Sequence, residues 1–221
     1  MKQFFFRLTK LFTGLFFCAL GIAFTINARI GFSPWDVFHA GLAKTLGISI
    51  GTASIATGIL ILILVILLGE KVGLGTVLNM ILIGAFLDLI LNLNLIPTAR
   101  NYILGVAMLI AGMIIFSFAT YLYIQSAFGA GPRDSLMVAL SRKTGYPIGF
   151  CRGFIELIVA LTGWKLGGMI GIGTVLFAFL IGLFIQITFK IFKFDATKVK
   201  HETFENTIKQ CFTSISEINK S

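Results

Sequence analysis

Two opposite charges lie four residues apart inside an otherwise apolar stretch of the sequence. Arg152 and Glu156 both fall within residues 147–166, and a spacing of four places them on one face of a helix. Ionisable side chains are costly in lipid and usually face the protein interior, where they bind a solute or pair with each other. The sequence leaves both interpretations open.

A second polar pair, Asp88 and Gln186, is separated by 98 residues, which is also the period of an internal repeat. Matching polar positions of two repeats are where transporters built from inverted repeats hold a substrate or an ion. Asp88, Arg152, Glu156 and Gln186 are therefore our candidates for a central substrate-binding site. Alternatively, Asp88 lies near the end of its helix, close to the membrane surface.

A helix-start motif occurs twice. Ser33 can cap a helix whose first residue is Pro34, and the carboxylate of Asp36 can reach back to the cap. The motif recurs, with glycine as the cap, at Gly131, Pro132 and Asp134. We expect these residues to be structural more than substrate ligands.

The helices that follow these motifs are too short to cross a membrane. Each is predicted to stop at a glycine, Gly47 or Gly145, which leaves a helix of about 20 Å. One interpretation is an interfacial helix with Trp35 and Phe38 among the lipid headgroups. The other is a half-helix inside the protein, with its positive N-terminal end directed toward a central site.

The elements that must position these residues are long apolar segments. Of the 221 residues, 57% are hydrophobic and 12% charged, whereas a soluble domain carries about a quarter charged residues. We therefore predict an all-α polytopic protein whose partner is the lipid bilayer. Its six predicted spans are residues 8–28, 49–68, 75–96, 102–124, 147–166 and 172–193.

The chain contains an internal repeat. Residues 31–88 align with 129–186 without a gap, and 18 of these 58 positions are identical. The matches include the Gly-x-Gly-Thr segments at 73–76 and 171–174. These resemble phosphate-cradling loops but lack the lysine of a P-loop, so close helix packing explains them better. We expect a first repeat at 1–98, a second at 99–194 and a polar tail at 195–221.

Each repeat contains three spans and a short extra helix after its first span. An odd number of spans forces the second copy into the membrane upside down, which predicts an inverted pair. The 18 Lys and Arg residues favour both termini in the cytoplasm, because the segments on that side hold more of them. The tail also carries an amphipathic pattern of Phe204, Ile208, Phe212, Ile215 and Ile218.

Composition and spacing argue against several classes of function. The basic residues lie at span ends and in the tail, which argues against nucleic-acid binding. The three cysteines and two histidines lack the spacing of a metal site, so neither a metal nor a cofactor is predicted. Without a nucleophile and base in the spans, we do not expect an enzyme.

The Gly-x-x-Pro-x-Asp and Gly-x-Gly-Thr motifs resemble those of the YczE/YyaS/YitT group of bacterial integral membrane proteins, closest to the YczE type. The resemblance covers residues 8–193, and 34–36 with 73–79 carry most of it. It implies a location in the bacterial cytoplasmic membrane. The tail lies outside it, and Arg133 departs from the Trp at the matching place of the first repeat.

These observations favour a small secondary-transporter-like permease or exporter whose two halves rock about a central site. A non-transporting scaffold or accessory subunit, docking a cytoplasmic partner through the tail, is the alternative. A small-molecule or ion substrate and a homo-oligomer are both compatible with the sequence.

Overall fold

The computed structural model describes residues 2–199 and 202, and these residues form eight α-helices and one 3-10 turn. The helices are α1 (Lys2–Asn27), α2 (Pro34–Leu46), α3 (Ile50–Leu67), α4 (Leu74–Asn92), α5 (Tyr102–Gln125), α6 (Pro132–Thr144), α7 (Ile148–Lys165) and α8 (Ile172–Ile191), followed by the turn Ala196–Lys198. The predicted amphipathic pattern of the tail, from Phe204 to Ile218, lies outside the described residues.

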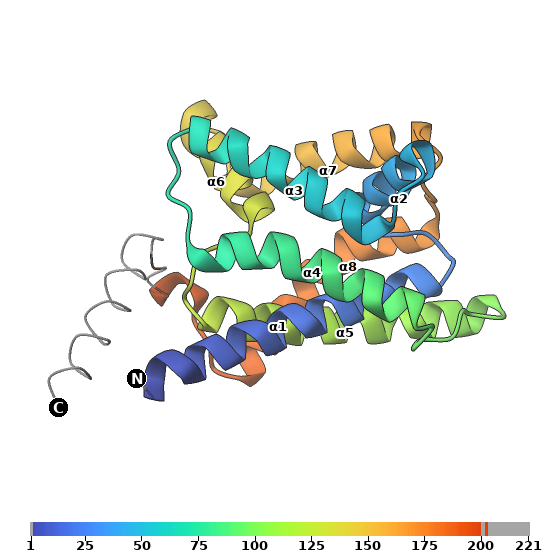
Figure 1. The fold of residues 1–221 in the computed structure, drawn as a ribbon, viewed down its shortest axis with the longest axis horizontal. Helices are drawn as coiled ribbons and strands as arrows, with labels where there is room; N and C mark the ends of the chain where they lie inside the picture. The colour runs from blue at the N-terminus through green and yellow to red at the C-terminus, as the bar shows by residue number, and fades with distance from the viewer. Residues whose placement is uncertain (1, 200–201, 203–221) are drawn as a thin grey trace, which may run out of the picture.

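The helices are arranged in two layers (Figure 1). The long helices α1, α4, α5 and α8 form one layer, and α3 and α7 lie in the other together with the short helices. The short helices α2 and α6 lie toward opposite ends of the molecule.

Five helices are long and apolar enough to cross a membrane, namely α1, α3, α4, α5 and α8. The remaining predicted span, residues 147–166, corresponds to α7, which carries three charged residues, Arg152, Glu156 and Lys165. Helices α6 and α7 are long and apolar enough to cross a membrane only when they are taken together, and their axes differ in direction by 119°. The expectation of a polytopic helical membrane protein is confirmed, with five spans or six.

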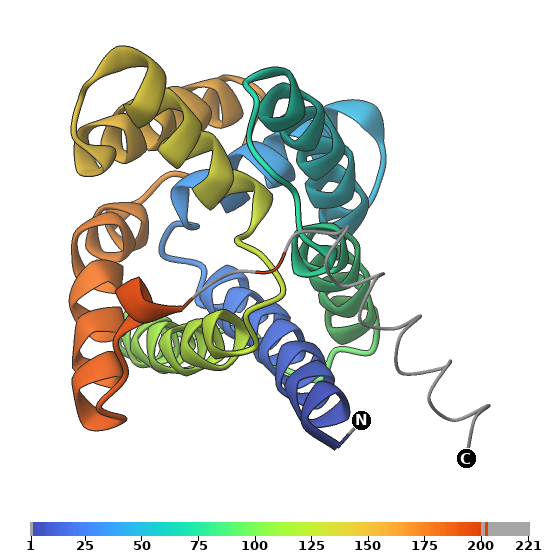
Figure 2. The same ribbon diagram turned by 90° about the vertical axis from the view of Figure 1, so that its left-hand side faces the viewer.

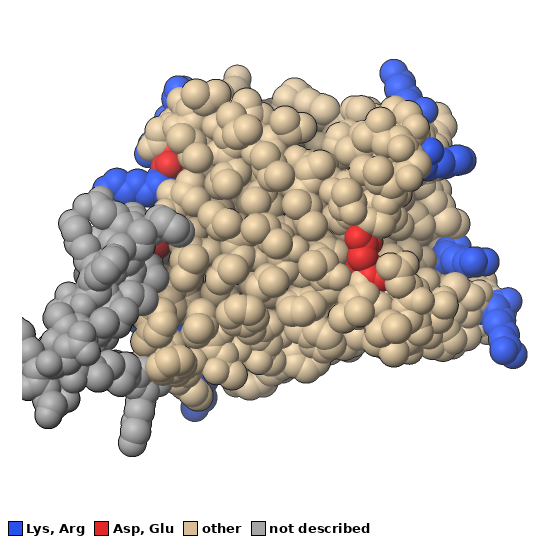
Figure 3. All heavy atoms as spheres, in the orientation of Figure 1, with Lys and Arg blue, Asp and Glu red and all other residues tan. Residues whose placement is uncertain are grey.

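The surface fits a lipid environment. Many large apolar side chains are exposed along α3, α5, α7 and α8, among them Leu67, Ile103 and Phe179. Figure 3 shows a broad band with few charges between two ends that carry Lys and Arg side chains. Such a band is expected where the hydrocarbon core surrounds a protein.

Local sequence sets the bounds of the short helices. Ser33 caps α2 by accepting a hydrogen bond from the Asp36 amide, and Pro34 occupies the first turn. The helix ends at Gly47, whose φ of 68° is left-handed, a conformation that glycine adopts without strain. A proline in the first turn and a left-handed glycine also bound α6, which begins after Gly131 and ends at Gly145 with a φ of 77°.

The first spans of the two repeats, α1 and α5, pack closely against each other. A methyl group on Gly21 would lie 2.9 Å from the carbonyl oxygen of Gly112, and one on Gly112 would lie 2.8 Å from the carbonyl oxygen of Gly21. Only glycine permits this approach of the two backbones at both positions. The main apolar core surrounds this pair and includes Leu87, Leu109 and Met113.

Each linker before a short helix is held by a helix from the other half of the chain. The amide of Gly75 donates to the carbonyl of Phe128 at 2.7 Å, and the amide of Gly173 donates to the carbonyl of Ile30 at 2.7 Å. The two donors are 98 residues apart, and so are the two acceptors. The Gly-x-Gly-Thr segments thus pack against the opposite repeat at the places that orient α2 and α6.

The described part of the tail docks near the linker before α6. The Glu202 carboxylate lies 2.6 Å from a guanidinium nitrogen of Arg7, and the Glu202 amide donates to the carbonyl of Ala127 at 2.8 Å. The Arg7 guanidinium also stacks on Phe128, 4.6 Å from the ring centroid. Residue 202 therefore lies beside the end of α5 that precedes α6.

Candidate functional site

A cavity of about 290 Å³ is lined by residues from both layers of helices. All eight α-helices contribute to its lining, and so do the caps of α2 and α6. The volume is close to the lower limit of about 300 Å³ for small-molecule sites in proteins. The cavity is therefore large enough for a small solute.

The lining takes matched positions from the two repeats. Twenty of its twenty-six residues form ten pairs whose members are 98 residues apart. These pairs are 18 and 116, 22 and 120, 33 and 131, 34 and 132, 35 and 133, 36 and 134, 54 and 152, 58 and 156, 79 and 177, and 83 and 181. The cavity thus lies where the repeats meet, with equivalent surfaces on both sides.

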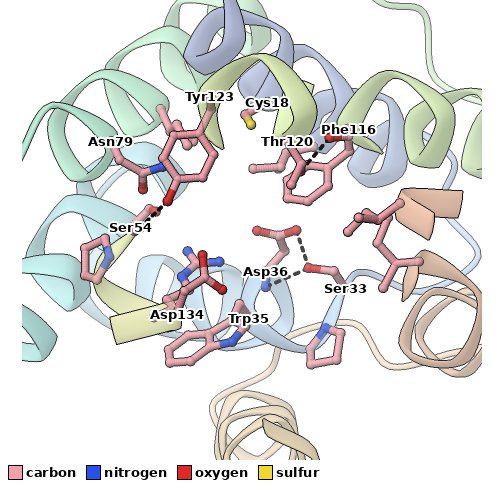
Figure 4. Close-up of a pocket in the computed structure, with 18 of the residues that line it drawn as sticks. Cys18, Ser33, Trp35, Asp36, Ser54, Asn79, Phe116, Thr120, Tyr123 and Asp134 are labelled. Atoms are coloured by element: carbon pink, nitrogen blue, oxygen red, sulfur yellow. Dashed lines mark hydrogen bonds between the residues drawn. The ribbon is translucent and has the colours of Figure 1, made fainter. Parts of the chain in front are cut away.

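The start of α2 brings a buried carboxylate to the cavity. The Asp36 carboxylate accepts a hydrogen bond from the Ser33 hydroxyl and lies 3.6 Å from Nδ1 of His39. All three residues are buried, so these contacts compensate part of the cost of removing the charge from water. In Figure 4 the Asp36 and Ser33 side chains face each other at the cavity wall.

The start of α6 is held differently. Its cap is Gly131, whose amide donates to the phenol oxygen of Tyr123 from α5. The side-chain oxygens of Asn79 and Asp134 lie close to the same glycine, each 3.4 Å from where its Cβ would be. Asp134 is exposed although it lines the cavity, whereas its counterpart Asp36 is buried.

Arg133 and Trp35 join the two short helices. The guanidinium carbon of Arg133 lies 4.7 Å from the Trp35 ring centroid, and Nη2 lies 3.3 Å from Nε2 of His39. Trp35 is only 7% exposed, and its indole nitrogen is buried without a hydrogen-bond partner in the described part of the chain. The headgroup position considered for Trp35 is wrong, because packing against Arg133 draws its ring into the interior.

Arg152 and Glu156 lie together at the cavity, on α7. The Arg152 Nε atom donates to the Glu156 carboxylate at 2.8 Å, and both residues line the cavity. The Arg152 side chain is 42% exposed and that of Glu156 is 15% exposed. The two charges neutralise each other, yet both remain accessible to a solute in the cavity.

Asp88 and Gln186 are not among the residues that line the cavity. Asp88 holds the start of α3, because its carboxylate accepts hydrogen bonds from the Gly51 amide at 2.8 Å and from the Ser49 hydroxyl. Gln186 is exposed on α8. The structure therefore brings two of the four substrate-site candidates together and leaves the other two outside.

The cavity lining combines charged and apolar side chains. The charged part consists of three carboxylates (Asp36, Asp134 and Glu156) and two guanidinium groups (Arg133 and Arg152). The positive N-terminal ends of α2 and α6 also reach the lining, and they favour negative charge nearby. The apolar part includes Met80, Phe116, Phe177 and Ile181.

The sequence contains one signal for cavity residues beyond our predicted candidates. Cys18, Trp35, Tyr123 and Arg133 line the cavity, but none was a predicted substrate contact. Arg133 is a charged residue beside a helix-start motif in a predominantly apolar chain. A charged residue at the position equivalent to Trp35 therefore indicated a cavity residue in the sequence. No such indication exists for Tyr123.

Comparison with known proteins places the chain in a family. Residues 5–190 match a model described as a family of unknown function (DUF6198). The chain is 36% identical over 184 residues to the uncharacterized membrane protein YczE of Bacillus subtilis, covering 82% of this chain and 85% of the relative. It is 34% identical to an uncharacterized protein of Haemophilus influenzae, over 78% of each chain.

A more distant relative is the uncharacterized protein YyaS of Bacillus subtilis, which is 27% identical over 79% of this chain and 88% of the relative. No solved structure gives a significant match. The resemblance noted at the Gly-x-x-Pro-x-Asp and Gly-x-Gly-Thr motifs is thereby confirmed: the chain belongs to the DUF6198 family of membrane proteins.

Proposed function

We propose that this protein is a permease or exporter for a small solute, which binds in the cavity between the two repeats. The observation that carries this proposal is the pairing of the lining residues at a separation of 98. Transporters built from two repeats bind substrate where the repeats meet, so that movement of one repeat against the other exposes the site to alternate sides.

We also infer that the two repeats are inverted relative to each other. The odd number of long helices in each repeat supports this, because the second copy must then enter the membrane from the opposite side. Further support comes from the reciprocal contacts of Gly75 with Phe128 and of Gly173 with Ile30. A two-fold axis in the membrane plane would generate one of these contacts from the other.

The lining favours a small amphipathic solute with at least one charged group. The carboxylates or the guanidinium groups of the lining can hold that group, and the apolar side chains of the lining can receive a hydrocarbon part. The Arg152–Glu156 pair can open, so that Arg152 receives a negative group or Glu156 receives a positive one. Binding and translocation need no bond to break, so we propose a carrier rather than an enzyme.

We propose the bacterial cytoplasmic membrane as the location, with both termini in the cytoplasm. The bacterial relative named as a membrane protein supports the first part. The basic residues at the ends of α3, α6 and α8 support the second, including Lys71, Arg142 and Lys190.

Flux measurements in vesicles test this function. Purified protein would be reconstituted into proteoliposomes, and uptake and efflux of amino acids, organic acids, amines and other small metabolites would be compared with empty liposomes. We expect flux of at least one solute, and a loss of that flux in Glu156→Gln, which leaves Arg152 without its ion-pair partner. Thr162→Val is the matched control, because Thr162 is exposed on the same helix and outside the cavity lining.

The outcomes separate the parts of the proposal. Absence of flux for every solute tested, with correctly folded protein in the vesicles, would contradict the permease. Flux that is equal in Glu156→Gln and wild type would remove Glu156 from the mechanism.

A further inference from the structure

The two repeats differ in how their second and third long helices pack. In the first repeat α3 packs against α4, and a methyl group on Gly51 would lie 2.1 Å from the carbonyl oxygen of Gly84. The two backbones are therefore in direct contact there, and neither glycine leaves room for a side chain.

The equivalent helices of the second repeat, α7 and α8, have no interface of comparable extent. The equivalent glycines are Gly149 and Gly182, and no atom of the described residues lies within 4 Å of a methyl group built on either. The sequence thus has glycines suited to close packing at a place where, in this conformation, no described helix packs. Figure 2 agrees with this difference: the ribbons of α3 and α4 lie side by side, and those of α7 and α8 are apart.

A polar interaction follows the same asymmetry. In the packed repeat the Asp88 carboxylate accepts a hydrogen bond from the Gly51 amide at 2.8 Å and so caps α3. Gln186 occupies the equivalent position on α8 but is exposed. The first amides of α7 receive no side-chain cap either, although a glutamine side-chain oxygen could accept from the Gly149 amide as Asp88 does from Gly51.

We propose that the structure is one of two end states, and that in the other α7 closes onto α8 through Gly149 and Gly182. Gln186 then caps α7, while α3 separates from α4 and Asp88 releases Gly51. Each repeat adopts the conformation that its counterpart has here. This inference rests on the proposed permease function and assigns the moving helices within it.

The two interfaces lie on opposite sides of the cavity. Gly51 is in the first turn of α3 and Gly149 is in the first turn of α7, and the proposed inversion directs these two turns toward opposite faces of the membrane. Closing one interface while opening the other would therefore move the access of the cavity from one face to the other. In the present state access lies on the face where α7 begins.

Two glycines of α7 provide a test substitution and its matched control. Gly149→Ile leaves the present state unaffected, because the site is open, but its side chain would block α7 from closing onto α8. Gly153→Ile lies one turn further along α7 and is equally open. Its equivalent in the packed repeat is Ile55, whose side chain already fits against Gly84, so that isoleucine at 153 is compatible with both states.

The test measures access to the cavity from each side. Cys18, Cys151 and Cys211 would be replaced, and a single cysteine introduced at Thr120, which lines the cavity (Figure 4). A membrane-impermeant maleimide would be added to one or the other side of oriented vesicles. We expect labelling from both sides without further substitution and with Gly153→Ile.

With Gly149→Ile we expect unchanged labelling from the side where α7 begins. Labelling from the opposite side should be slower by about tenfold or more, since overpacking of this size disfavours the closed interface. Equal labelling of Gly149→Ile and Gly153→Ile from that opposite side would overturn the inference. So would labelling of the unsubstituted reporter from one side alone.

Cross-linking provides a second, independent measurement. A cysteine pair at 149 and 186 corresponds to the Gly51–Asp88 contact of the packed repeat, and we expect it to form a disulfide as the alternate state is sampled. Failure of this pair to cross-link, in protein whose Thr120→Cys reporter reacts from both sides, would show that α7 and α8 do not close in the way proposed. Solute flux is not used in either measurement, so their failure is distinct from failure of the permease.

Discussion

Arg133 lies against Trp35, with its guanidinium carbon 4.7 Å from the centroid of the indole ring, and the two residues occupy equivalent positions in the two repeats. Strict symmetry would bring two identical side chains together at this point. A tryptophan and an arginine can instead form a cation–π contact there. The two repeats therefore differ at this position, and the difference allows Arg133 of the second repeat to interact with Trp35 of the first.

Replacing Arg133 by leucine should lower both stability and solute flux. The change removes the contact with Trp35 and the contact of Nη2 with His39. A desolvated cation–π contact contributes about 2 kcal/mol, so we expect a loss of this order in thermal or denaturant unfolding. Arg142→Leu is the control, because Arg142 is 56% exposed in its pair with Glu70 and should cost less than about 1 kcal/mol. Equal losses for the two variants would contradict the role of Arg133.

Asp88→Ala should destabilise the fold, and Gln186→Ala should not. Asp88 caps α3 through Gly51 and Ser49, and loss of a cap costs about 0.5–2 kcal/mol. Gln186 is exposed on α8, and within the described part of the chain its side chain makes no hydrogen bond that would hold the fold. Unfolding of both variants would be followed by loss of helical circular dichroism. A greater loss for Gln186→Ala than for Asp88→Ala would be inconsistent with the structure.

Gly41→Leu should disrupt the packing of α2 against α7. A methyl group on Gly41 would lie 2.3 Å from the carbonyl oxygen of Gly163, so a larger side chain must push the two helices apart. Overpacking of this kind typically costs about 1–3 kcal/mol, measurable as a lower midpoint of thermal unfolding. Gly153→Leu serves as the comparison because its site is open, and we expect it to unfold like wild type.

Cysteines at Lys44 and Arg142 should be labelled from opposite sides of the membrane. Both residues are exposed near the ends of α2 and α6, which the proposed inversion places on different faces. An impermeant maleimide added to intact cells should react with Lys44→Cys, and Arg142→Cys should react only after the membrane is opened. Reaction of both in intact cells would exclude the inverted arrangement and the alternating access derived from it.

Elements with a strong local signal were predictable from the sequence. The apolar runs gave the long helices, and the Pro34 and Pro132 motifs with Gly47 and Gly145 gave the bounds of α2 and α6. These signals are local, because capping and helix termination depend on residues within one or two turns. Charge spacing also brought Arg152 and Glu156 to one face of α7.

What the sequence did not reveal depends on contacts between distant segments. Asp88 caps a helix that begins nearly forty residues earlier, and no local pattern distinguishes such a cap from a substrate ligand. Trp35 is buried by Arg133 of the other repeat, although a tryptophan at the start of a short helix is also typical of a membrane interface. Helices α3 and α4 pack together, whereas α7 and α8 do not. Both repeats have the glycines that such packing needs, so the sequence does not indicate which pair is in contact.

The hydrogen bonds from Gly75 to Phe128 and from Gly173 to Ile30 make the two halves of the chain depend on each other. Each half of the chain supplies the glycine amide that holds the linker before the other half's short helix. Neither half can therefore form its own contact alone. Under the inverted arrangement proposed above, a half-length chain of three long helices would make both contacts at once by pairing with an identical copy in the opposite orientation. A side chain at Gly75 or Gly173 would meet the linker of the opposite half, at Phe128 or Ile30, so a substitution in one half would disturb the short helix of the other.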